Sequence, residues 1–148
     1  MSLALAAALL AQAPTAETPR DFVTRIYAGY RDPGYNPLDR PERLFALPLV
    51  AAIREDARLS RDEVGRLDGD PLCQCQDHEG LEPLVEAVSR PAARTALADV
   101  RLRFPGYGDR QVRLRLVRTA RGWRIADVAT PDSPSLLREL RRSNRRRR

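Results

Sequence analysis

Residues 96–126 read ALADVRLRFPGYGDRQVRLRLVRTARGWRIA, and apolar and polar side chains alternate along most of this stretch. A period of two places alternate side chains on opposite faces of a β-strand. Glycine-containing turns at residues 105–109 and 120–122 interrupt the alternation. The pattern predicts an antiparallel sheet with one apolar face and one wet, arginine-lined face. The apolar set includes Val100, Leu102, Phe104, Val112, Leu114, Leu116, Trp123 and Ile125.

An apolar helical stripe lies near the start of the chain. Phe22, Ile26 and Tyr30 recur every four residues, which is the spacing of one helix face. Thr18 is a good N-cap, and the sequence Asp-Pro-Gly at residues 32–34 is a strong helix breaker. The sequence therefore predicts a helix between these two signals.

Residues typical of helix starts predict three further helices. Pro41 lies near the start of the second, and Pro48 is expected to kink or split it. Ser60 and Glu63 form a capping box that opens a short third helix. Ser-Pro at residues 133–134 opens a short C-terminal helix. Because the apolar face of the sheet needs a cover, we expect an α+β fold in which N-terminal helices pack on a curved antiparallel sheet.

The N-terminal residues have the character of an export signal. Residues 3–13 read LALAAALLAQA, a short apolar run that ends in a small-x-small pattern. We interpret residues 1–17 as a signal peptide or disordered N-terminus, residues 18–140 as one α+β domain, and residues 141–148 as an arginine-rich disordered tail. A periplasmic or secreted location follows, and the alternative is a cytoplasmic protein with an alanine-rich N-terminus. No later segment is long and apolar enough to cross a membrane.

The net positive charge of the chain arises at its C-terminal end. Residues 138–148 hold seven arginines and one glutamate, and their net charge of +6 equals that of the whole chain. The remainder is therefore neutral, so nucleic acid is not an expected partner of the folded part. The arginine-rich segment lacks the aromatic residues that stack on bases. It is either a solvated terminus or a contact surface for an anionic polymer or lipid.

Two cysteines stand close together in the segment Cys73-Gln74-Cys75-Gln76-Asp77-His78. A structural zinc site usually pairs two separate ligand clusters, so Cys73, Cys75 and His78 are weak metal candidates and no metal or other cofactor is predicted. A disulfide between the cysteines requires a turn, because two residues in extended backbone lie near the upper limit for bridging. Two buried thiols remain the alternative.

Four carboxylates are candidates for chemistry. Asp68, Asp70 and Asp77 lie in a turn-rich segment, where aspartates commonly accept hydrogen bonds from backbone N–H groups. Asp127 has the same parity as Trp123 and Ile125, so we expect its side chain to point toward the inner face of the sheet. Acid–base catalysis would require one of these carboxylates to be buried with a raised pKa.

The order of helices followed by a curved antiparallel meander resembles the cystatin-like or NTF2-like cone. A closer resemblance is to a bacterial exported family called domain of unknown function 3828 (DUF3828). The matching residues are Phe22, Tyr27, Tyr35-Asn36-Pro37, Leu67-Asp68-Gly69-Asp70-Pro71, Gln76-Asp77, Leu116-Val117-Arg118, Gly122-Trp123-Arg124-Ile125-Ala126-Asp127-Val128 and Ser135-Leu136-Leu137. The resemblance implies a fold and an envelope location but no activity. The Cys73–Cys75 insert and the arginine tail are not part of it.

These observations predict an exported, non-catalytic protein that binds a small ligand or a protein partner in the cone pocket. The candidate ligand-binding residues are Asp68, Asp70, Gln76, Asp77, Trp123 and Asp127. One alternative is an NTF2-like enzyme that uses Asp127, by analogy with the inward carboxylate of such isomerases, or the three loop aspartates. A second alternative is an anionic-polymer binder that acts through the arginine-rich tail.

Overall fold

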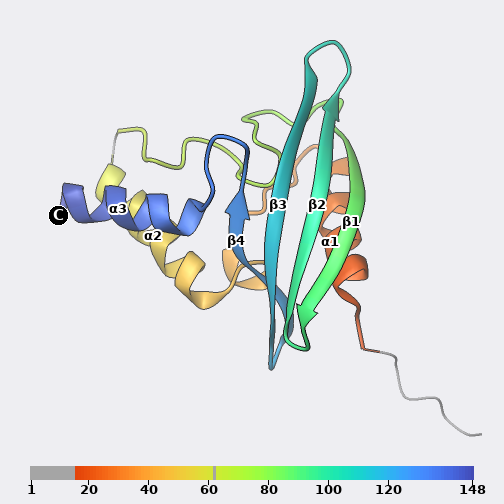
Figure 1. The fold of residues 1–148 in the computed structure, drawn as a ribbon. Coiled ribbons are helices and arrows are strands. Elements are labelled where there is room, and N and C mark those ends of the chain that lie inside the picture. Colours follow the sequence, from red (N-terminus) through yellow and green to blue (C-terminus); the bar gives the residue numbers. More distant parts are fainter. Residues whose placement is uncertain (1–15, 62) are drawn as a thin grey trace, which may run out of the picture.

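The computed structural model describes residues 16–61 and 63–148. Helices come first in the chain, a four-stranded sheet follows, and one helix comes after the sheet (Figure 1). The elements are α1 (Pro19–Ala28), the 3-10 turns η1 (Gly29–Arg31) and η2 (Pro41–Arg43), α2 (Leu47–Ser60), β1 (Glu82–Ala92), β2 (Thr95–Phe104), β3 (Gly108–Thr119), β4 (Gly122–Ala129) and α3 (Leu136–Arg147). The predicted α+β class with an antiparallel sheet is confirmed.

The sheet is a simple meander in the order β1-β2-β3-β4, with every neighbouring pair antiparallel. The β2–β3 turn contains Gly106 and Gly108 at φ values of +86° and +84°, a region that glycine adopts without steric cost. Alternate residues of β2 and β3 are buried, so the apolar face predicted from the period of two is present. The fully buried side chains include Leu102, Leu114, Leu116 and Ile125.

Helix α1 covers the inner face of the sheet behind β1 and β2 (Figure 1). Its capping box pairs Thr18 with Asp21, and its apolar stripe buries Phe22, Ile26 and Tyr27. The free edge of β4 is occupied by the chain before α2, because the Ile125 N–H donates to the Leu44 oxygen at 2.7 Å. One hydrophobic core therefore joins α1, the sheet and the start of α2.

Two helix predictions were wrong. Residues 41–43 form only a 3-10 turn, and α2 begins at Leu47, so Pro48 lies in the first turn, where its missing N–H costs no hydrogen bond. Among the residues described on either side of position 62, no helix follows the capping box at Ser60. Helix α2 ends there, and the Ser60 hydroxyl donates to the Asp56 oxygen at 2.6 Å. Arg61 has a φ of +47°, which interrupts the helical path.

The predicted disordered tail is helical as far as Arg147. Leu140 and Asn144 are buried against α2, and the Asn144 amide donates to the Ala52 oxygen at 3.0 Å. The Arg147 guanidinium forms an ion pair with the buried Asp56. These tertiary contacts outweigh the repulsion among neighbouring arginines, which composition alone cannot reveal.

Residues 1–15 of the predicted signal segment lie outside the described residues. Within residues 16–61 and 63–148, no helix combines the length and the apolarity needed to span a bilayer.

Candidate functional site

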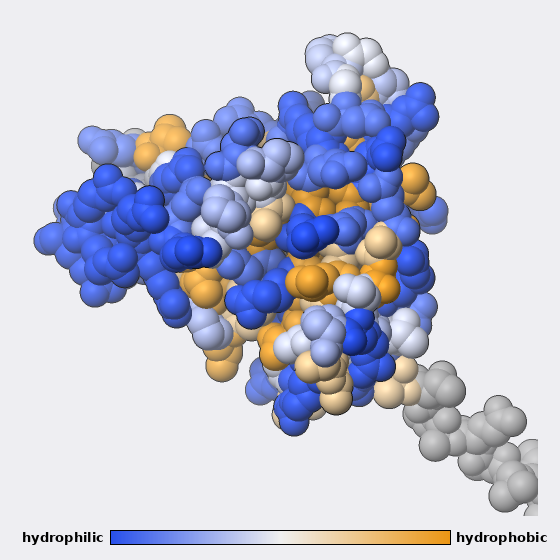
Figure 2. All heavy atoms as spheres, viewed as in Figure 1, coloured by the Kyte–Doolittle hydropathy of each residue, from blue (hydrophilic) through white to orange (hydrophobic). Residues whose placement is uncertain are grey.

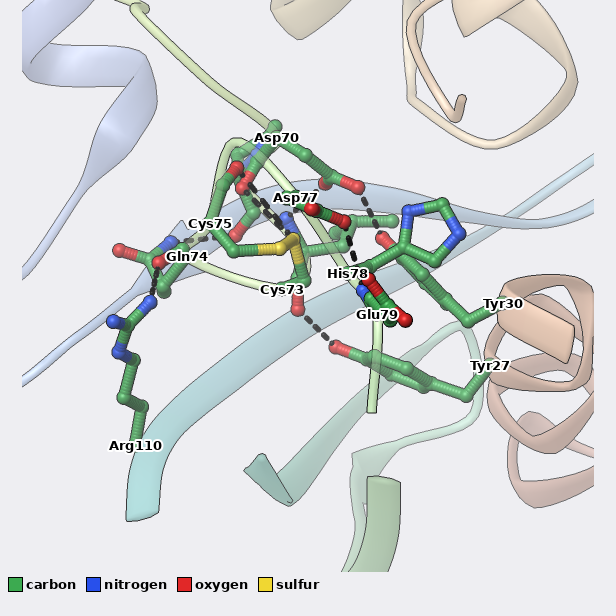
Figure 3. Close-up of a disulfide and its surroundings, with 12 residues drawn as sticks. Tyr27, Tyr30, Asp70, Cys73, Gln74, Cys75, Asp77, His78, Glu79 and Arg110 are labelled. Carbon is green, nitrogen blue, oxygen red and sulfur yellow. Dashed lines mark hydrogen bonds between the residues drawn. A yellow bond between two sulfur atoms is a disulfide. The ribbon is translucent and has the colours of Figure 1, made fainter. Parts of the chain in front are cut away.

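The connection from α2 to β1 contains a loop that we define as residues 66–78 and call the disulfide loop (Figure 3). A disulfide joins Cys73 to Cys75, with the Cα atoms 5.2 Å apart. The required turn is made by Gln74, whose φ is +54°. Of the two alternatives for these cysteines, the structure contains the disulfide. The backbone N–H of Asp70 donates to the Cys75 oxygen at 2.9 Å and closes the loop on itself.

Asp70 fastens the disulfide loop to η1, the 3-10 turn that follows α1. Its carboxylate accepts a hydrogen bond from the Tyr30 hydroxyl at 2.5 Å and another from the Leu72 N–H at 2.8 Å (Figure 3). Burial raises the pKa of Asp70 above its ordinary value, and both hydrogen bonds oppose this shift because they favour the ionised form. Asp70 therefore joins two parts of the fold, with both carboxylate oxygens already in use.

Three tyrosines pack beside the loop: Tyr27 and Tyr30 contact it directly, and Tyr35 contacts Tyr30. The Tyr27 hydroxyl donates to the Leu72 oxygen at 2.8 Å, and Tyr30 contacts the rings of Tyr35 and His78 edge to face. Burial raises the pKa of Tyr27 and of Tyr30, and it raises the pKa of Tyr35 to about 12. All three phenols are thus protonated donors at neutral pH. Sequence reasoning placed Tyr27 and Tyr30 on a helix face but missed their contacts with the loop.

A cleft of about 520 Å³ separates one side of the disulfide loop from the connection between β4 and α3. Its charged and polar lining includes Arg66, Asp68, Gln76, Arg110 and Glu139. The Arg110 guanidinium donates to the Gln74 oxygen, so the β2–β3 hairpin is fastened to the loop. Arg66 pairs with Glu139 of α3 at 2.5 Å. Neither Arg66 nor Arg110 was predicted, because their proximity depends on how distant elements meet.

A second cleft of about 710 Å³ lies on the other side of the same loop. It is lined by Tyr35, Asn36, Asp77 and His78, among others. Asp77 accepts a hydrogen bond from the Glu79 N–H at 2.9 Å, the turn-capping role expected of such aspartates. His78 Nε2 lies 3.1 Å from the Asp32 oxygen. The disulfide loop therefore separates two polar clefts, and it brings together Asp68, Asp70, Gln76 and Asp77.

Trp123 does not join this group. Its side chain is 1% exposed, and its indole N–H donates to the Glu17 oxygen at 3.1 Å. The ring is therefore buried in the core, away from the loop that carries the other candidates, and its ligand-binding role stays a prediction.

Asp127 also differs from its prediction. Leu116 pairs with Ile125 but Arg115 pairs with Asp127, so Ala126 is an extra residue, a β-bulge that reverses the alternation. The Asp127 carboxylate accepts hydrogen bonds from the Leu137 N–H at 3.0 Å and from the Ser135 hydroxyl. It therefore anchors the first turn of α3 and does not reach the inner face of the sheet.

The candidate metal ligands do not form a common site. Cys73 and Cys75 share a disulfide and offer no thiolate, and His78 is turned toward Tyr30 and Asp32. In the part of the chain that the structure describes, no three His, Cys, Asp or Glu side chains are grouped as a metal site would require.

The geometry defines an α+β protein with a polar, disulfide-closed loop as its candidate site. Comparison with known proteins finds no family model, no curated protein and no solved structure that matches the chain. The resemblance to DUF3828 and to the NTF2-like cone stays a prediction.

Proposed function

We propose that this chain is an exported, non-catalytic binding protein that engages a small ligand or a protein partner at the disulfide loop. The observation that carries the proposal is a loop closed by the Cys73–Cys75 disulfide and flanked by two polar clefts. Disulfides persist mainly in oxidising compartments, which supports export together with the apolar run at residues 3–13. We also propose a cystatin-like or NTF2-like fold of the DUF3828 kind, supported by α1 on an antiparallel sheet with a buried Trp123.

In this proposal the ligand binds at the disulfide loop and not on the inner face of the sheet. Apolar side chains with no exposed surface, such as Leu102, Leu114 and Leu116, fill the inner face. The exposed groups of the loop, Asp68 and Gln76, offer both acceptors and a donor. Preorganisation by the disulfide and by Arg110 lowers the entropy cost of ordering the loop on binding.

Catalysis receives less support than binding. Asp127 is engaged by the start of α3, and Asp70 by Tyr30 and the loop backbone. A general base needs an oxygen within hydrogen-bond reach of the substrate. Both carboxylates would have to leave structural hydrogen bonds to act on one.

Two measurements test the proposal. Expression of the full chain in a bacterium, followed by cell fractionation and intact mass analysis, should place a shortened and oxidised form outside the cytoplasm. A photo-crosslinking amino acid at Gln76 should then capture a specific adduct in cells, whereas the same amino acid at Gln111, an exposed glutamine of β3, should not.

A small ligand would be detected by amide NMR with defined mixtures of sugars, amino acids and organic anions. Shifts should cluster at residues 66–78 and at Arg110. A cytoplasmic full-length form refutes export. Equal adducts at both glutamines, or shifts centred on the sheet, refute the location of the site.

A further inference from the structure

Helix α3 presents a cationic face that the binding site does not use. Arg138, Arg141, Arg142, Arg145 and Arg146 are all exposed and recur at the spacing of one helix face. None forms a salt bridge to another described residue. Figure 2 shows hydrophilic residues gathered over α3. We call these five residues the arginine face.

The arginine face is held rigid by the opposite side of the same helix. Leu140 and Asn144 are buried against α2, and Arg147 is paired with Asp56. Arg148 pairs with Glu55 at 3.0 Å. Arg147 and Arg148 thus form ion pairs with α2, whereas no acidic residue of the described ranges pairs with the arginine face. An ordered array loses less conformational freedom on binding than a disordered tail.

Apolar groups border this array on the neighbouring helix. Leu47 is 77% exposed at the start of α2, Pro48 beside it is exposed, and Ala51 is exposed one turn further on. Pro48 and Ala51 line a shallow cleft of about 350 Å³ together with Arg141 and Arg145. The two helices lie side by side (Figure 1), so cations and apolar groups share one end of the molecule.

We propose that this end of the protein, formed by the arginine face and by Leu47, Pro48 and Ala51, docks on the surface of an anionic phospholipid bilayer. Guanidinium groups bind phosphates through paired hydrogen bonds, and several arginines at fixed spacing can engage several headgroups. Apolar side chains beside the cations gain from entering the headgroup boundary, as on interfacial helices.

A nucleic acid fits this surface less well. The arginine face carries no aromatic residue that could stack on a base. Leu47 would also stay in water beside a phosphate backbone, whereas a bilayer removes it from water. Docking of this kind goes beyond ligand binding at the disulfide loop, because it uses residues that do not line the clefts beside that loop.

The test is co-sedimentation of the full chain with vesicles of phosphatidylglycerol and phosphatidylcholine, with pure phosphatidylcholine vesicles as the reference. Each arginine near an anionic surface strengthens binding about fivefold, so the R141Q/R145Q double variant should bind roughly 25-fold more weakly. The matched control is R40Q/R121Q, which removes the same charge from exposed positions outside α3 and should bind only slightly more weakly.

A second pair of variants tests the apolar contribution. L47Q should weaken vesicle binding roughly three- to tenfold, while L84Q, which replaces an exposed leucine of β1, should not. Raising NaCl from about 0.1 M to 1 M shortens the Debye length from about 10 Å to about 3 Å and should release most of the protein. Circular dichroism confirms that each variant is folded.

Three results would overturn the proposal. The first is no sedimentation with phosphatidylglycerol vesicles at low salt. The second is equal loss of binding in R141Q/R145Q and R40Q/R121Q, which would indicate a response to net charge alone. The third is binding to a DNA duplex or to polyphosphate that exceeds vesicle binding and ignores L47Q. That result would assign the arginine face to a polymeric anion.

Discussion

Asp56 connects three segments of the fold, and its replacement by asparagine is the sharpest test of why residues 141–147 are helical. The side chain is 3% exposed. Its two oxygens accept hydrogen bonds from the backbone N–H groups of Arg66 and Leu67 at 3.1 and 3.0 Å, and from the Arg147 guanidinium. Asparagine keeps the shape of the side chain, but it loses the charge and one acceptor.

The expected cost follows from the groups left behind. Breaking a buried ion pair by removing one partner costs about 3–5 kcal/mol. Arg147 retains 28% side-chain exposure, so water partly replaces the lost carboxylate, and we expect the D56N variant to lose about 2–4 kcal/mol of unfolding free energy. For a domain of this size the melting temperature should fall by roughly 6–16 °C.

Urea denaturation followed by circular dichroism measures the loss, and amide hydrogen exchange locates it. Protection at residues 141–147 should decrease more than protection in β2 and β3, because α3 loses its anchor. D99N is the matched control: Asp99 pairs with Arg113 on the wet face of the sheet, and exposed pairs contribute about 0–1 kcal/mol. If D56N proves as stable as D99N, or if exchange in α3 is unchanged, the tertiary explanation of the helix is refuted.

Three further predictions concern the loop and the start of α3. Burial raises the pKa of Asp70 in the folded state, so above about pH 3.9 the folded state holds the Asp70 proton more tightly than the unfolded chain does. The contribution of Asp70 to the unfolding free energy is therefore complete below that pH and is lost as pH rises through the folded pKa. D70N should remove this part of the pH dependence of unfolding, whereas Y30F should only alter it; an identical pH profile for D70N and the unchanged protein would contradict the reasoning. Replacing Cys73 and Cys75 by serine should cost only about 1–2 kcal/mol in urea denaturation, because the closed ring is very short, and should increase amide exchange in the loop. D127A should lower stability by about 1–2 kcal/mol through the start of α3 while leaving binding at the loop unaltered, and loss of binding without loss of stability would restore a functional role to that carboxylate.

The sheet and the first helix were predictable because their signals are local. Alternation along β2 and β3, the glycine turns and the Thr18 cap each depend on residues within a few positions. The helix boundaries at Pro41 and Ser60 were not predictable in this way. The same residue types start or stop a helix according to neighbours far away in the chain.

The candidate site was predictable only in part. The turn aspartates and the neighbouring cysteines identified the disulfide loop, since Asp68, Asp70, Cys73 and Cys75 are close in sequence. The partners of the loop were not identified, because Tyr30 reaches it from η1 and Arg110 from β3. Nothing in the sequence near either residue signals that contact.

The amino-acid sequence by itself determined the class of fold, the wet and apolar faces of the sheet and the position of the loop that carries the disulfide. Short-range stereochemistry suffices for each of these, since side-chain alternation and turn residues act over a few positions. Only the tertiary structure decided that the Asp127 side chain lies away from the inner face of the sheet and that the arginine-rich segment is a helix. A one-residue bulge reverses every later side chain in a strand, and a buried partner such as Asp56 can order a charged helix that would not form alone.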